Sequence, residues 1–388
     1  MTSRRSLAGL GLALGLLACT SRGGPHAAAE PSAALSSVVV PSSRASASPT
    51  SSALPITASS SSSSSAPVRS DLAPPLALPD DGPIRAVDLH VDTPWRVHFK
   101  GRPKSADEGP ATPALLRAGQ YAAVVYPIYL PDYIHDDHPA IADADAVYAT
   151  IDAIVAEHEA LVPPSATVDA DSVAVFVSIE GAGAFAEDIT QIDRFVKRGV
   201  KFVGPVHARD NRLAGAATGK KRGGLTTLGK QFCERVYAAG GLIDVSHLSD
   251  TGFEDLRPIA KNFGAPIVAT HSNARAKNKH RRNLTDKQLR VIGETGGVAG
   301  LNLHRGFLDS GDMAGVVAMV RHMVATAGVE HVALGTDFEG GSATEAIKDA
   351  SKLPALAEAL KKAGFSDVDV RKIFAKNALR VLAWKPAK

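Results

Sequence analysis

VAVFVSIEG, at residues 173–181, is the clearest indication of fold in this chain: seven almost wholly apolar residues lead into the carboxylate of Glu180. Such continuous hydrophobicity is typical of a strand that is buried on both faces of a parallel sheet. A carboxylate at the end of a buried strand is costly unless it has a partner, which can be a metal ion or an arginine. In a parallel α/β barrel all strands end at one rim, where the functional residues gather.

The same arrangement, an apolar run that ends in a potential metal ligand, recurs along the chain. The other examples are AVDLHVDTPW with His90 and Asp92, LIDVSHLSD with His247, PIVATHSNA with His271, and VALGTDFEG with Asp337. One such residue would carry little information, but five strand ends of this kind predict a metal site. The ligand types indicate two ions.

We predict an α/β fold, a (β/α)8 barrel of the TIM type with a dinuclear metal site at the carboxyl-terminal rim of its strands. The expected strands are 84–90, 120–128, 173–180, 201–207, 241–247, 265–271, 297–303 and 330–336. Helical patterns at 141–161, 228–240 and 286–296 lie between them, and this alternation indicates a parallel sheet. An open doubly wound sheet would need a glycine-rich turn after the first strand, where this chain has HVDTP. A last helix, with Ser366 as its N-cap, is expected to pack against the barrel wall.

Composition divides the chain into three parts. Residues 1–19 have the features of an export signal, and its end, LLAC, resembles the cleavage box of bacterial lipoproteins. We therefore predict a lipoprotein-type signal and lipidation of Cys19, with an ordinary secretory signal cut elsewhere as the alternative. Residues 20–74, rich in Ser, Ala and Pro, bury too little apolar surface to fold and are expected to form a disordered tether. Residues 75–388 are expected to form the barrel.

Composition also limits where the protein is found and what it binds. Thr20, not aspartate, follows Cys19, so an exported, lipid-anchored protein of the cell envelope is expected, at the outer membrane or facing the periplasm. The net charge of +3 comes with no basic stripe interleaved with aromatic residues, so nucleic acid is not an expected partner. If Cys19 is lipidated, Cys233 is the only other thiol, which excludes an intramolecular disulfide. Cys233 is expected to be a small buried residue.

The side chains at the strand ends suit divalent metal ions. His90 and Asp92 are two residues apart, so on a strand both point to the same side and can reach one cation. Imidazole nitrogen with carboxylate oxygen suits zinc, or less specifically manganese or cobalt. Glu180 has two oxygens and can bridge two ions, the second of which His247 and His271 would bind. Either histidine taken alone could equally be a hydrogen-bonded core residue.

Read in order, HxDTP, SxEG, LIDxSH, APxxxTHS followed by RRN, and GTDFEG resemble the membrane (renal) dipeptidase family of amidohydrolase-type metal barrels, over most of residues 84–383. The resemblance implies two zinc ions per chain, bridged by Glu180. The ligands that it implies are His90, Asp92 and Glu180 for one ion and Glu180, His247 and His271 for the other. Many members of the wider superfamily use a carboxylated lysine as the bridge, and this chain has no lysine at the end of its third or fourth predicted strand.

The resemblance also assigns three positions around the substrate. His207 corresponds to a histidine that approaches the scissile carbonyl oxygen, Arg282 to the residue that binds the substrate carboxylate, and Asp337 to a carboxylate near the substrate amino group and the bridging water. A dipeptide has a free ammonium and a free carboxylate, and arginine can bind a carboxylate through two parallel hydrogen bonds. The implied activity is hydrolysis of dipeptides by a hydroxide that bridges the metals, and whether L-D dipeptides are substrates stays open. His207 is expected to stabilise the oxyanion and Asp337 to handle the proton.

Some features leave alternatives open. Val91 replaces an asparagine that relatives often carry, but residue 91 should point away from the metals. Gly181-Ala182-Gly183 stands where relatives tend to have Gly-His, which leaves the substrate preference open. The segment 209–224 is either a mobile lid or an exposed loop. The alternative activity is that of a related amidohydrolase or lactonase on another small amide or ester. A non-catalytic surface binding lipoprotein is less favoured because every ligand is present, and homodimerisation stays open.

Overall fold

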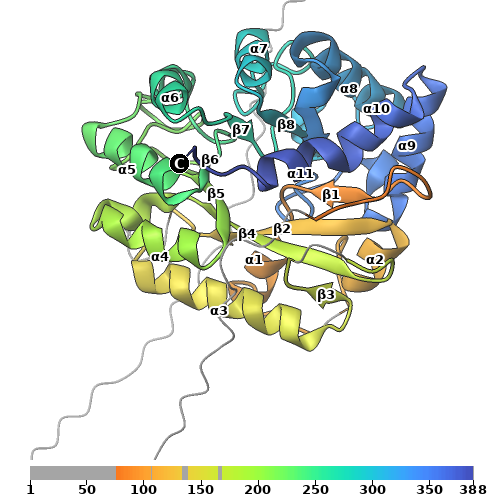
Figure 1. Cartoon of the computed structure of the whole chain (residues 1–388), viewed down its shortest axis with the longest axis horizontal. Coiled ribbons are helices and arrows are strands. Elements are labelled where there is room, and N and C mark those ends of the chain that lie inside the picture. The colour runs from red at the N-terminus through yellow and green to blue at the C-terminus, as the bar shows by residue number, and fades with distance from the viewer. Residues whose placement is uncertain (1–75, 106, 133–138, 165–167, 388) are drawn as a thin grey trace, which may run out of the picture. The chain divides into compact units, whose positions relative to one another are not determined.

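The computed structural model describes residues 76–387 except 106, 133–138 and 165–167. The predicted signal, the predicted lipidation site Cys19 and the predicted tether lie outside these residues. In the described part, the barrel strands follow one another around a ring in the order β6-β5-β4-β2-β1-β9-β8-β7 (Figure 1).

The eight strands of this ring lie where the apolar runs predicted them. They are β1 (Ala86–Asp88), β2 (Tyr121–Tyr129), β4 (Val173–Glu180), β5 (Val200–Gly204), β6 (Leu242–Ile243), β7 (Val268–Ala269), β8 (Val298–Leu301) and β9 (Val332–Leu334). All their pairings are parallel. A parallel bridge between Asp244 and Val268 joins the β6 segment to β7 and closes the ring. The predicted (β/α)8 barrel is thereby confirmed, with one addition, the short strand β3 (Leu161–Val162) that pairs with β4.

Helices follow most of the strands and surround the ring (Figure 1). They are α1 (Thr93–His98), α2 (Pro113–Ala118), α3 (Ile141–Glu157), α4 (Ile192–Lys197), α5 (Thr227–Ala239), α6 (Asp250–Asn262), α7 (Asp286–Glu294), α8 (Met313–Ala327), α9 (Leu353–Lys362) and α10 (Asp367–Arg371). Hydroxyl caps start several of them, because a side-chain oxygen can accept one of the N–H groups that have no helical partner. Ser366 is such a cap, as predicted, and accepts the backbone N–H of Asp369 at 3.1 Å.

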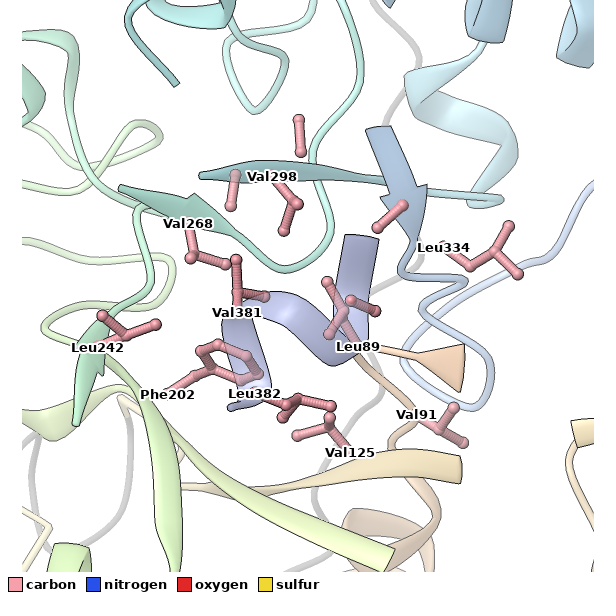
Figure 2. Close-up of a cluster of buried hydrophobic side chains, with 14 of the residues drawn as sticks. Leu89, Val91, Val125, Phe202, Leu242, Val268, Val298, Leu334, Val381 and Leu382 are labelled. Atoms are coloured by element: carbon pink, nitrogen blue, oxygen red, sulfur yellow. The ribbon is translucent and has the colours of Figure 1, made fainter. Parts of the chain in front are cut away.

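The predicted last helix consists of α10, a π-helical turn (Lys372–Lys376) and α11 (Asn377–Leu382). Of these, α11 covers the amino-terminal end of the barrel and does not lie on its wall as predicted. Figure 2 shows its Val381 and Leu382 among apolar side chains of the strands. These neighbours include Phe202, Leu242 and Val268. Lys201, at the start of β5, donates a hydrogen bond to the carbonyl oxygen of Trp384 just after α11. The helix thus shields apolar side chains that the strand starts would otherwise expose to water.

Two smaller findings complete the fold. Within residues 76–387, apart from the gaps named above, no helix is long and apolar enough to cross a membrane. Cys233 is a buried free thiol on α5, and burial raises its pKa, as expected of a small core residue. With α11 at the amino-terminal end, the carboxyl-terminal end of the barrel is the one where a site can open.

Candidate metal and substrate site

Each of the eight strands leads to a polar residue at the carboxyl-terminal rim. These residues are His90 and Asp92 after β1, Tyr129 on β2, Glu180 on β4, His207 after β5, His247 after β6, His271 after β7, Asn302 and His304 after β8, and Asp337 after β9. Parallel strands end together, so residues far apart in sequence become neighbours here. All five predicted metal ligands and both His207 and Asp337 lie at this rim, and Arg282 reaches it from the loop after β7.

The carboxylate of Glu180 lies at the centre of a histidine cluster. Its Oε1 is 2.9 Å from Nε2 of His247, 3.5 Å from Nε2 of His271 and 3.7 Å from Nε2 of His90. The Nε2 atoms of His247 and His271 are 3.1 Å apart. In the described part of the chain Glu180 forms no ion pair with an arginine, the alternative that the sequence had left open.

The other ligands join this cluster through His90. Its Nε2 is 3.4 Å from Oδ2 of Asp92, and the potential ligand atoms of His90, Asp92 and Asp337 all lie within 4.8 Å of one another. The same holds for two further sets, His90, Glu180 and His271, and Glu180, His207 and His247. The sets overlap at His90 and Glu180, so the donors form one continuous cluster with room for cations on either side of the glutamate.

The state of the donor atoms fits metal ions. Among the described residues, the two ring nitrogens of His90 and Nδ1 of His247 are buried and have no hydrogen-bond partner. Buried polar atoms normally have partners, so such atoms point to a missing ligand. Burial, followed by the charge of Arg282, lowers the pKa of His247 well below its usual range. Burial, followed by the charge of His90, does the same for His271. Both imidazoles are therefore neutral, which is the form that binds metals.

The ring of His271 is held by Thr270 and Asp244. The buried carboxylate of Asp244 accepts the backbone N–H groups of Ser246 and Thr270 at 3.0 and 2.9 Å, and it also accepts the hydroxyl of Thr270. Because the Thr270 hydroxyl donates its hydrogen bond to Asp244, its oxygen can only accept the Nδ1–H of His271, at a distance of 2.8 Å. Nε2 of His271 therefore carries the free lone pair that faces Glu180.

We expect the substitution Thr270→Val to weaken metal binding by about 10- to 100-fold, the usual effect of removing a group that orients a ligand. Valine keeps the shape of threonine but leaves Nδ1–H of His271 without an acceptor. Affinity is measured by competition with a chromophoric chelator. Thr150→Val, the same change on helix α3, should leave it unaltered, and equal affinities for both variants and the wild type would refute the assigned role.

Arg282 presents a cation to the cavity that the rim encloses. Its side chain is buried, its Nη1 donates to Oγ of Ser272 at 3.1 Å, and its Nη2 lies 3.4 Å from the carbonyl oxygen of His271. Its Nε has no hydrogen-bond partner among the described residues. A buried guanidinium with an unused donor at a cavity wall can bind a carboxylate.

Asp337 lines the same cavity, in an unusual backbone conformation. Its φ is +62°, in the left-handed region, and its Oδ2 accepts a hydrogen bond from Nδ2 of Asn302 at 2.9 Å. Burial first, and then the neighbouring charge of Asp92, raise the pKa of Asp337 to about 6. A carboxyl group with such a pKa can exchange protons near neutral pH.

Gly340 has no side chain, and the carboxylates of Asp337 and Asp92 occupy the space where one would lie. A Cβ atom at this position would lie 2.3 Å from Oδ1 of Asp337 and 2.4 Å from Oδ2 of Asp92. We expect Gly340→Ala to displace both carboxylates and to lower kcat/KM at least tenfold, with zinc affinity reduced in parallel and the thermal midpoint nearly unchanged. Gly223→Ala is the matched control, because a Cβ there meets no atom within 4 Å. Unchanged kinetics of Gly340→Ala would show that the carboxylates tolerate movement.

The structure adds site residues that the sequence analysis overlooked. Nδ1 of His207 is 3.4 Å from both Oδ2 of Asp132 and the hydroxyl of Tyr129, and Asp132 also accepts the backbone N–H of Ala208 at 3.0 Å. Trp95, Tyr129, His304 and Phe307 line the cavity. Two signals were present: YLPD follows the second predicted strand, and His304 directly follows the seventh.

Comparisons with known proteins cover the whole site. A sequence profile of the family described as membrane dipeptidase (peptidase family M19) matches residues 83–385. The chain is 36% identical over 222 residues to a Klebsiella pneumoniae protein named only for the pqqA 5′ region, spanning 54% of this chain and 81% of that protein. It is 27% identical over 224 residues to a Schizosaccharomyces pombe protein named as an uncharacterized dipeptidase, spanning 55% of this chain but only 53% of that protein.

Several solved structures are similar in fold, and one that is also similar in sequence illustrates the match. It is a metallopeptidase from Rhodobacter sphaeroides, solved with a phosphinate mimic of the dipeptide L-Ala-D-Ala. The two chains are 26% identical, with a TM-score of 0.68 and coverage of 78% of this chain and 99% of that one.

Proposed function

The chain belongs to the membrane dipeptidase family of metallopeptidases, and from this premise we propose that it is a zinc-dependent dipeptidase. The observation that supports this most directly is the arrangement of side chains at the rim. Glu180 lies among three histidines, beside a cavity that Arg282 and Asp337 line. That cavity has a volume of about 190 Å³. Pockets for drug-sized molecules measure roughly 300–1,000 Å³, so this one suits a molecule as small as a dipeptide.

We propose two zinc ions per chain, with Glu180 as the shared ligand. His90 and Asp92 would complete one site, and His247 and His271 the other. The position of Glu180, within 4 Å of a ring nitrogen of three histidines, supports a bridging role. Nitrogen and carboxylate donors are those that zinc prefers. When bound, such ions lower the pKa of water towards about 7 and polarise a carbonyl oxygen.

The chain's own side chains bind and orient the substrate. Arg282 would bind the carboxylate of the dipeptide and Asp337 its ammonium group, and these opposite charges select a molecule of that length. Asp337 would also move the proton, for which a pKa of about 6 is suited. His207, held at Nδ1 by Asp132, would hydrogen-bond the scissile carbonyl oxygen as negative charge develops there.

The direct test is release of amino acids from a panel of L-L and L-D dipeptides by the full-length protein loaded with zinc. The panel includes L-Ala-D-Ala because the Rhodobacter sphaeroides structure holds a mimic of that dipeptide. Release that a Glu180→Ala variant lacks would support the proposal. A zinc-loaded protein that cleaves no dipeptide would overturn it and move the substrate to another small amide or ester.

We also propose that the protein is exported and anchored through a lipid on Cys19, and we leave homodimerisation as a secondary proposal. The anchoring proposal is supported by the signal-like residues 1–19 and the LLAC box. Metabolic labelling with a fatty acid should mark the wild type but not Cys19→Ala. An unlabelled wild type in the soluble periplasmic fraction would instead indicate a secretory signal.

A further inference from the structure

Two loops at the site rim carry a large excess of positive charge. Residues 207–224 contain five basic side chains and one acidic side chain, and residues 274–282 contain five basic and no acidic side chains. Together these basic rim loops have a net charge of +9, whereas the whole chain has only +3. The rest of the chain is therefore net negative, and the positive charge is concentrated at one place in the fold.

Both loops are fixed beside the cavity. The backbone N–H of Ala217 in the first loop donates to the carbonyl oxygen of the predicted ligand His247 at 2.8 Å. The second loop supplies Arg282, and its His280 ring lies 4.7 Å from the ring of Phe307 between centroids. Arg282 and Phe307 both line the cavity. Each basic rim loop thus contributes a residue to the cavity lining, His207 from the first and Arg282 from the second.

Acidic groups balance only part of the charge of these loops. The carboxylate of Asp210, the one acidic group in the loops, accepts the backbone N–H groups of Ala216 and Lys221 at 2.9 and 2.7 Å. Arg275 pairs with Asp250 at 2.7 Å. The exposed side chains Lys220, Lys221, Lys279 and Arg281 form no ion pair with any described residue. Their charge is therefore exposed to the solvent beside loops that line the cavity.

Such a field distinguishes ligands by net charge. Like charges gathered around a cleft raise the local concentration and the association rate of oppositely charged ligands by 10- to 1,000-fold. A dipeptide with neutral side chains is a zwitterion without net charge, whereas an acidic side chain adds one negative charge. Arg282, on the second of these loops, is the residue proposed to hold the C-terminal carboxylate. The side chain of the second amino acid would thus bind on the basic side of the mouth.

We propose that the basic rim loops make this site selective for dipeptides whose second residue is aspartate or glutamate. The inference rests on the proposed dipeptidase function and adds a substrate class to it. Ala-Glu and Ala-Gln form a matched pair for the test, because they have nearly the same shape and differ in charge. At about 10 mM salt the full-length enzyme should have a kcat/KM for Ala-Glu at least tenfold above that for Ala-Gln.

Salt and charge removal should both reduce this ratio. The Debye length falls from about 30 Å at 0.01 M salt to about 3 Å at 1 M, so the ratio should drop at least threefold in 0.5 M NaCl. The double variants Lys220→Gln/Lys221→Gln and Lys279→Gln/Arg281→Gln should each lower kcat/KM for Ala-Glu at least threefold and leave Ala-Gln unaffected.

The matched control is Lys261→Gln/Lys362→Gln, which removes two exposed charges from the last turns of α6 and α9. In a (β/α)8 barrel these helix ends lie opposite the catalytic rim, so both dipeptides should be cleaved as by the wild type. The selectivity is refuted if the wild type has nearly equal kcat/KM values for Ala-Glu and Ala-Gln, or if the rim variants behave like this control. Cleavage of Ala-Gln would still support the dipeptidase function. If neither dipeptide is cleaved, the dipeptidase function itself is refuted. The affinities for Ala-Glu and Ala-Gln, measured by calorimetry, then test the selectivity, and equal affinities would refute it.

Discussion

Glu180→Gln is expected to lower kcat/KM for any dipeptide by at least about a thousandfold and to reduce bound zinc below two ions per chain. Glutamine has the shape of glutamate, but its amide removes the negative charge that lies within 4 Å of three histidine nitrogens. A neutral amide is a poor ligand for zinc, and a bridging group serves both ions of a two-metal site. The loss should therefore affect both metal positions.

Zinc content by mass spectrometry and turnover of L-Ala-L-Ala, measured on the same preparation, test this expectation. Glu187→Gln is the matched control, since Glu187 is an exposed carboxylate shortly after the same strand. It should bind zinc and turn over as the wild type does. A Glu180→Gln protein with two zinc ions and wild-type turnover would show that Glu180 is not a metal ligand.

Arg282→Met is expected to raise KM for neutral dipeptides by roughly 30- to 1,000-fold, with zinc content unchanged. A charge-assisted pair of hydrogen bonds to a buried partner is worth about 2–4 kcal/mol, and each 1.4 kcal/mol is a factor of ten in affinity. Methionine fills part of the buried space but cannot donate a hydrogen bond. The guanidinium lies at the cavity wall with its Nε unpaired among the described residues, which is the geometry on which the expectation depends.

The comparison of L-Ala-L-Ala with its C-terminal amide identifies the group that Arg282 binds. The amide lacks the carboxylate, so the wild type should cleave it poorly and the variant should lose little further activity on it. Arg281→Met provides the control, because Arg281 is exposed and a neutral dipeptide does not respond to its charge. An unchanged KM of Arg282→Met for L-Ala-L-Ala would refute the carboxylate assignment.

Residue types at the strand ends were readable without the structure. A strand buried on both faces must be continuously apolar, so a polar residue at its end, such as Glu180 or His271, stands out against its surroundings. The same rule placed all eight strands, although β6 and β7 are much shorter than their predicted runs. It could not place α11, because an apolar helical face shows that a surface is buried but not against what.

The contacts around His207 could not be predicted from the sequence. Asp132 and His207 follow different strands, and only the curvature of the ring brings their side chains to 3.4 Å. Similarly, the pKa of Asp337 is raised through burial and through Asp92 from the other end of the barrel domain's sequence. Neither the Asp132–His207 distance nor the raised pKa of Asp337 has a signal in the local sequence, because both arise from the closure of the barrel.

The strand pattern, the kinds of ligand and the family to which their order belongs follow from the residues alone. The packed barrel was needed to show that Glu180 lies within 4 Å of ring nitrogens of three histidines and that two basic loops, far apart in the chain, each contribute a residue to one cavity. The physical reason is that hydrophobicity and ligand chemistry belong to single residues and short segments. Distances, burial and the fields of neighbouring charges belong to the packed barrel.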